Sequence, residues 1–133
     1  MNSADNKHTV GIIGVRDLRG RVYDNGPYAV SIIRRHITLI GLSMRDIRVC
    51  TGGSKGVEKL IIDWCVENKI PYSCITPKIK SLGSERAFEV RNIEVVSSSD
   101  SLVFYWDGLV PAIPKAIAQA MHVGKAVTTY PVL

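Results

Sequence analysis

The stretch whose residue types most directly suggest chemistry is Thr-Gly-Gly-Ser-Lys-Gly, residues 51–56. It follows an apolar β-branched run and precedes an amphipathic stretch with helical spacing, so it is predicted to join a strand to a helix. Glycines allow close approach of the backbone to a ligand, helix-start N–H groups favour an anion, and Lys55 could add a full positive charge. The spacing matches neither the P-loop nor the Gly-x-Gly-x-x-Gly fingerprint. Two interpretations stay open, an anion-binding loop or a tight structural turn.

Three further segments place polar side chains beside apolar runs. Gly-Val-Arg-Asp at 14–17 follows a buried run, and its arginine could hold a phosphate or only pair with the neighbouring aspartate. Glu-Val-Arg-Asn-Ile-Glu at 89–94 would be a solvated helix face if taken alone. Phe-Tyr-Trp-Asp-Gly at 104–108 could stack a ring on Trp106 and bind a ribose through Asp107, or form an Asp-Gly turn.

The elements that must position these residues alternate along the 133-residue chain. Such alternation predicts a parallel sheet with helices on both faces and ligands beyond the carboxyl ends of its strands. We therefore expect one α/β domain over residues 9–133, after a disordered tail at 1–8. Strands are predicted at 9–15, 47–51, 71–76, 101–106 and 125–130, and helices at 27–40, 57–65, 86–98 and 114–123.

Composition restricts the class of protein. The chain is 46% apolar and 22% charged, as in globular domains, and its scattered positive charges (net +5) favour an anionic small ligand over a nucleic acid. No apolar run approaches the ~20 residues of a membrane span, and the first residues lack a signal-peptide core, so a cytoplasmic protein is expected. Three cysteines without CxxC spacing and three widely separated histidines predict buried thiols, histidines at the surface or an edge, and no metal site.

Taken in order, the segments resemble the SLOG superfamily. The likeness extends from Val10 to Val132 and rests on GVRD, TGGSKGVEKLIIDWC, VRNIEVV, SDSLVFYWDG and AMHVGK. This superfamily includes the Lonely Guy phosphoribohydrolases, the Smf/DprA DNA-processing proteins and the YspA-like (YpsA-related) proteins, and the sequence is most similar to the last branch. The resemblance implies a single Rossmann-like domain that binds nucleotides or nucleotide-derived ligands.

The resemblance also implies which residues contact the ligand. The resemblance places Arg91 in the ligand pocket rather than on a solvated helix face, because the corresponding arginine faces the ligand in Lonely Guy enzymes. We therefore expect Arg91→Ala to weaken binding without unfolding the chain. Together with the other residues of the glycine-rich loop, the predicted ligand contacts are Gly14, Arg16, Asp17, Gly52, Gly53, Ser54, Lys55, Gly56, Arg91, Asn92, Trp106, Asp107 and Gly108.

Departures from the family pattern bear on activity. The Ser-x-Gly-Thr that follows Trp-Asp-Gly in the YspA-like branch aligns with the apolar residues 110–113, and Val15 stands where that branch has serine. The catalytic glutamate of Lonely Guy enzymes has no counterpart between Pro114 and Met121. The sequence therefore favours ligand binding over ligand cleavage. Cleavage would require Glu58 or Glu94 to supply the catalytic carboxylate.

Three functional hypotheses follow. The leading one is a module that binds a mononucleotide, ADP-ribose or a cyclic ADP-ribose-type signal for sensing or sequestration. The family context suggests that this role extends to phage–host conflict. The alternatives are a nucleotide N-glycosidase using Glu58 or Glu94, and a DprA-like binder of single-stranded nucleic acid that only the basic charge supports independently. The resemblance also implies a homo-oligomer, and we expect no cofactor and no membrane partner.

Overall fold

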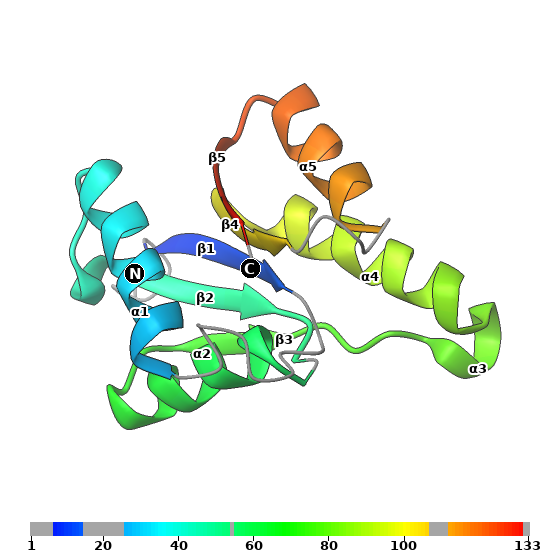
Figure 1. Ribbon diagram of the computed structural model, residues 1–133, viewed down its shortest axis with the longest axis horizontal. Coiled ribbons are helices and arrows are strands. Elements are labelled where there is room, and N and C mark those ends of the chain that lie inside the picture. Colours follow the sequence, from blue (N-terminus) through cyan, green and yellow to red (C-terminus); the bar gives the residue numbers. More distant parts are fainter. Residues whose placement is uncertain (1–6, 15–25, 54, 107–111, 132–133) are drawn as a thin grey trace.

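Strands and helices alternate along the chain as the apolar pattern predicts (Figure 1). The computed structural model describes residues 7–14, 26–53, 55–106 and 112–131. Most bounds lie within two residues of the predicted ones, and η2 and α3 are additional short helices. The elements are β1 (His8–Gly14), α1 (Gly26–Leu39), η2 (Met44–Asp46), β2 (Ile47–Thr51), α2 (Val57–Glu67), β3 (Tyr72–Cys74), α3 (Ile79–Leu82), α4 (Ser84–Ser98), β4 (Ser101–Trp106), α5 (Ala112–His122) and β5 (Ala126–Pro131).

The five strands form one parallel sheet in the order β3-β2-β1-β4-β5. Val10 of β1 lies between Val49 of β2 and Ser101 of β4. Helix α1 packs on α2 and α4 packs on α5, and the two pairs cover opposite faces of the sheet (Figure 1). The chain is therefore a single Rossmann-like α/β domain. Strand order reverses between β1 and β4, so ligands are expected beyond the carboxyl ends of these strands.

Burial differs between the central strands and the edge strand β3. Strands β1 and β4 are almost wholly buried, as predicted for strands covered on both faces. All three residues of β3 are exposed, so the prediction of a buried thiol is wrong for Cys74. It holds for Cys50 and Cys65, which are buried and free, and burial raises the pKa of Cys65 to about 12.

Helices α5 and α3 each leave large apolar side chains exposed. In α5 the buried residues are Ile113, Ala116 and Ala120, whereas Met121 is 66% exposed. Met121 lies about 100° around the helix from Ala120 and so points away from the sheet. In Figure 1, α3 and the first part of α4 extend past the edge of the sheet, and all four residues of α3 are exposed.

A buried hydrogen-bonded chain ties the amino-terminal edge of the sheet to α1. His36 lies 2.7 Å from Thr128 Oγ1 through Nδ1 and 2.8 Å from Ser101 Oγ through Nε2. His8 Nε2 lies 2.7 Å from the same serine oxygen. His36 is only 1% exposed, so the prediction of a surface or edge histidine is wrong for it, because α1 packs directly over the sheet. Burial, with His8 nearby, lowers the pKa of His36 to about 4.

No helix in the described ranges is long and apolar enough to cross a membrane.

The predicted tail at residues 1–8 overlaps the first strand by one residue, because β1 begins at His8. Residues 1–6 lie outside the described part of the chain.

Candidate functional site

The carboxyl edge of the sheet brings together residues from distant parts of the sequence. Gly14 ends β1, Thr51 ends β2 and Trp106 ends β4. Because parallel strands end at the same edge, the segments that follow Thr51 and the start of α2 lie next to the end of β1. The Thr51 hydroxyl donates a 2.8 Å hydrogen bond to the carbonyl of Ile12, which ties the end of β2 to β1.

The central feature of this edge is a buried ion pair between α2 and α4. Glu58 is fully buried and Arg91 is 4% exposed. Arg91 Nη1 lies 3.3 Å from Glu58 Oε1, and the Gly14 N–H donates to Glu58 Oε2 at 3.2 Å. Arg91 Nε donates to the side-chain oxygen of Asn92 at 2.9 Å, and its guanidinium carbon lies 5.2 Å from the centre of the Phe88 ring. The pair therefore joins β1, α2 and α4 at one point, which we call the Glu58–Arg91 cluster.

Two glycines make this arrangement sterically possible. A Cβ on Gly52 would lie 1.8 Å from Arg91 Nη1 and 2.5 Å from Arg91 Cδ, so only a glycine lets the arginine cross the end of β2. A Cβ on Gly14 would lie 2.9 Å from Val57 Cβ, so the first turn of α2 packs directly on the end of β1. Both predicted site glycines thus serve close contacts within the chain.

The loop between β2 and α2 has the features of an anion-binding turn. Gly53 and Gly56 have positive φ angles of 71° and 87°, which favour glycine. Gly56 is the N-cap of α2, and the partial positive charge of a helix N-terminus favours an anion. Gly53 and Lys55 are exposed beside them. Backbone donors and a cation thus share one loop that opens to solvent.

Burial of the charged pair has a signal in the sequence that the helix-face interpretation overlooked. Glu58 stands three residues before Ile61 and seven before Cys65, both fully buried. Arg91 stands four residues after Ala87 and four before Val95, which are also buried. Helical periodicity therefore places both charges on core-facing sides of their helices, so the segment at 89–94 is not a wholly solvated face, as it would be if taken alone.

The remaining predicted site residues lie in three places. Trp106 is half-buried at the end of β4 and packs against the core. Glu94 is exposed on the outer side of α4, away from Glu58. The residues Arg16, Asp17, Ser54, Asp107 and Gly108 lie outside the described part of the chain.

Metal ligation has no candidate among the residues that the structure describes. No group of three or more His, Cys, Asp or Glu side chains there is arranged to hold an ion. At the Glu58–Arg91 cluster, the carboxylate already faces the guanidinium of Arg91, which would repel a cation.

Neither a protein-family model nor a curated protein sequence matches the chain. Membership of the SLOG superfamily therefore stays a prediction from the sequence motifs.

Proposed function

We propose that the protein binds a small nucleotide-derived ligand at the carboxyl edge of its sheet. The observation that carries this proposal is the joint position of the loop at residues 52–56 and the Glu58–Arg91 cluster. The loop offers backbone N–H groups and Lys55, and it lies next to the point where strand order reverses. The SLOG-like motifs point to the same edge, and they suggest a mononucleotide, ADP-ribose or cyclic ADP-ribose-type ligand.

The described residues suggest different roles for different parts of the site. The loop is suited to a phosphate, because Gly53 and Lys55 are exposed beside the N-terminus of α2. Arg91 is already engaged by Glu58 and Asn92, so its first role is to fix the shape of the edge. Half-buried Trp106 supplies an aromatic surface at the end of β4.

Cleavage of the ligand receives less support than binding. Glu58 is fully buried and accepts bonds from both Gly14 and Arg91, so its carboxylate is committed to structure. Glu94, the other candidate, lies on the outer face of α4. Neither is placed as a solvent-facing acid or base beside the glycine-rich loop, which favours sensing or sequestration over N-glycosidic cleavage.

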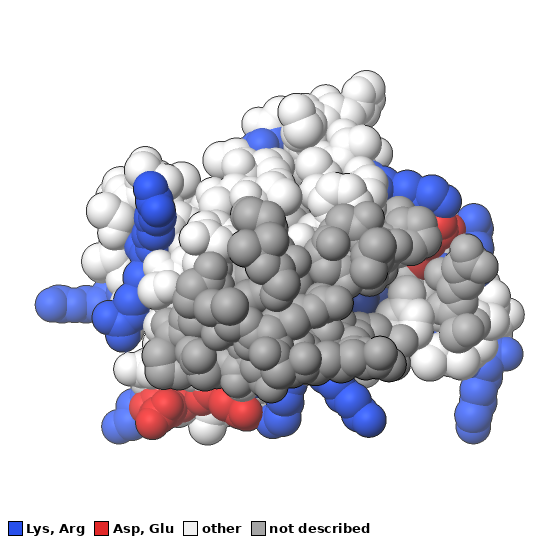
Figure 2. Space-filling model, viewed as in Figure 1, with Lys and Arg blue, Asp and Glu red and all other residues white. Residues whose placement is uncertain are grey.

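Nucleic-acid binding also receives little support. On the one face that Figure 2 draws, the Lys and Arg side chains of the described residues are spread around the outline, with acidic side chains among them. A protein that follows a phosphate backbone concentrates its positive charge in a patch or stripe. A single small anion needs only the loop at residues 52–56.

Removal of the Lys55 charge tests the phosphate position. With ADP-ribose as the probe, Lys55→Ala is expected to raise the dissociation constant about tenfold, because a charge-assisted contact is lost. Isothermal titration calorimetry provides the measurement. Lys59→Ala is the matched control, since Lys59 is exposed one turn further along and pairs with Asp63 at 2.7 Å.

Equal affinities for the wild type, Lys55→Ala and Lys59→Ala would place the phosphate elsewhere. Equal weakening in both variants would indicate only a general effect of positive charge. Because both lysines are exposed, neither variant is expected to change the free energy of unfolding by more than about 0.5 kcal/mol.

A further inference from the structure

A groove between α1 and α2 is a second surface feature, and none of the residues of the loop at 52–56 lines it. It has a volume of about 430 Å³, within the range of about 300–1,000 Å³ that is typical of small-molecule sites. On α2 it is lined by Leu60, Trp64 and Glu67, which are spaced by four and three residues. On α1 it is lined by Val30 and Arg34, which are spaced by four. The groove therefore lies between facing stripes of the two helices.

The indole of Trp64 gives this groove a hydrogen-bond donor that is not satisfied. Trp64 is 6% exposed, and its Nε1 is buried with no hydrogen-bond partner among the residues that the structure describes. Buried polar groups in folded proteins almost always have a partner, because a buried donor without one destabilises the folded state. An acceptor oxygen that reaches Nε1 from the groove removes this cost. Trp64 therefore favours a ligand that carries a carbonyl or hydroxyl oxygen.

Charged side chains of both signs are available along the groove. Arg34 of α1 and Glu67 of α2 are exposed, and neither forms an ion pair with another residue in the described ranges. Asp63, which also lines the groove, is already paired with Lys59 at 2.7 Å. A guanidinium binds a carboxylate, and a carboxylate binds an ammonium group. The two helices therefore offer complementary contacts to a ligand that carries both charges.

We propose that this groove binds a short peptide with free ends and apolar side chains. The peptide carboxylate pairs with Arg34, its amino group pairs with Glu67, and a main-chain carbonyl accepts from Trp64 Nε1. Its side chains pack on the Trp64 ring and on half-buried Val30 and Leu60. Leu60 and Glu67 are about 10 Å apart along the axis of α2, which accommodates two or three extended residues of about 3.3–3.6 Å each.

The same groove does not suit the nucleotide-derived ligand proposed above. Phosphate groups would face the carboxylates of Asp63 and Glu67, whereas a zwitterion meets an opposite charge on each helix. The inference therefore goes beyond the proposed nucleotide binding and does not depend on it.

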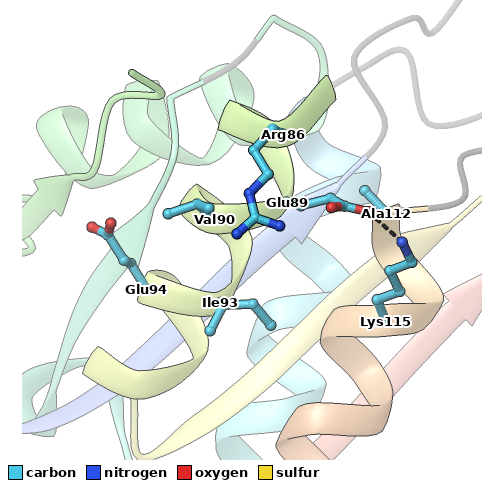
Figure 3. Close-up of a pocket in the computed structure, with 7 residues that line it drawn as sticks. All are labelled: Arg86, Glu89, Val90, Ile93, Glu94, Ala112 and Lys115. Atoms are coloured by element: carbon cyan, nitrogen blue, oxygen red, sulfur yellow. Dashed lines mark hydrogen bonds and ion pairs between the residues drawn. The ribbon is translucent and has the colours of Figure 1, made fainter. Parts of the chain in front are cut away.

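The groove between α4 and α5 provides a comparison within the same chain. It also combines apolar residues with charges of both signs (Figure 3). Lys115 and Glu89 pair with each other there, and no buried polar atom without a partner lines it in the described part of the chain. It thus lacks the donor that distinguishes the groove beside Trp64. Arg86, which is exposed in it, is a suitable control position.

Nuclear magnetic resonance of the isotope-labelled protein tests the proposal, with L-leucyl-L-leucine as the probe. The chain contains two tryptophans, so the Trp106→Phe variant assigns the two indole N–H signals. The dipeptide is expected to move the Trp64 signal downfield to saturation, because this proton gains an acceptor, and to leave the Trp106 signal in place. ADP-ribose is expected to leave the Trp64 signal in place, so a failure of one proposal is distinguishable from a failure of the other.

Substitution of the two groove charges tests the class of ligand. Arg34→Gln and Glu67→Gln are each expected to raise the dissociation constant of the dipeptide about tenfold, because each loses a charge-assisted contact. Arg86→Gln should leave the dissociation constant unchanged. The same dipeptide with acetylated and amidated ends should bind about a hundredfold more weakly, because both charges are gone. All three substituted side chains are exposed, and the same spectra check that each variant is folded.

A Trp64 signal that stays in place up to the solubility limit of the dipeptide would overturn the proposal. Equal affinity for the capped and uncapped dipeptides would also overturn it, as would one affinity shared by Arg34→Gln, Glu67→Gln and Arg86→Gln. Parallel movement of both indole signals would contradict binding at this groove, because it would indicate a general effect of the dipeptide.

Discussion

Gly52→Ala is expected to lower the free energy of unfolding by about 3 kcal/mol. The added Cβ would lie 1.8 Å from Arg91 Nη1 and 2.3 Å from Arg91 Cζ, so the arginine would have to leave its position. Glu58, which is fully buried, would then lose its charged partner. A buried carboxylate without its partner is far more costly than the methyl group alone, and urea denaturation followed by circular dichroism measures the loss.

A double-mutant cycle separates this cause from a local backbone effect. Arg91→Ala alone is expected to cost about 3–5 kcal/mol, because it leaves Glu58 buried and unpaired. Gly52→Ala in the Arg91→Ala background should then cost less than about 1 kcal/mol, because the clash has gone. Additive losses would contradict the account. Arg86→Ala, an exposed change on the same helix, is the control and should shift stability by about 0.5 kcal/mol or less.

The buried pair also changes how Arg91 can be used to test binding. The sequence motifs alone predict that Arg91→Ala weakens ligand binding and leaves the fold intact. With both partners buried, the substitution is expected to reduce stability, so reduced binding by that variant would have two causes. The exposed Lys55 is the better probe of the ligand contact.

Acid is expected to weaken the fold through His36. Its pKa is about 4 in the folded chain, lowered mainly by burial, against an ordinary value of 6.5. The unfolded chain therefore binds more protons between these pH values, and the contribution to stability is complete above pH 6.5 and lost as the pH falls towards 4. From this shift, the free energy of unfolding is expected to fall by about 2 kcal/mol between pH 7.5 and pH 5.

Comparison of two histidine variants isolates this contribution. His36→Gln should reduce the difference in the free energy of unfolding between pH 7.5 and pH 5, because no imidazole remains to be protonated. His122→Gln should leave that difference unchanged, because His122 is exposed. An unchanged pH dependence in His36→Gln would mean that other groups account for the acid sensitivity.

The fold was predictable because its signals are local and repeated. Buried β-branched runs alternate with amphipathic helical stretches, and this pattern alone predicts a parallel sheet. The right-handedness of the crossover connections then restricts the order of the strands. The exposure of the edge strand β3 was harder to predict than the strand itself. Its apolar neighbours in the sequence suggest burial, whereas its place at the end of the strand order exposes it. Helix α3 is a single turn between Gly- and Pro-containing segments, which carry little periodic signal.

The candidate site was predictable in outline but not in the roles of its residues. The glycines after β2 are at the predicted edge, and Gly52 also leaves room for the side chain of Arg91, which the sequence did not indicate. The Glu58–Arg91 pair joins residues 33 positions apart, and only the relative placement of α2 and α4 brings them together. Periodicity within each helix indicates that both charges face the core, but it cannot supply the partner that makes their burial tolerable.

Recovery of a bound ligand tests the central claim most directly. The purified protein is incubated with mononucleotides, NAD, ADP-ribose and cyclic ADP-ribose isomers, freed of unbound compound and heated, and the released molecules are identified by mass spectrometry. We expect one intact nucleotide-derived ligand per chain. Retention of none of these compounds would contradict ligand binding at this edge, and accumulation of a free base with a ribose phosphate beyond stoichiometry would contradict binding without cleavage.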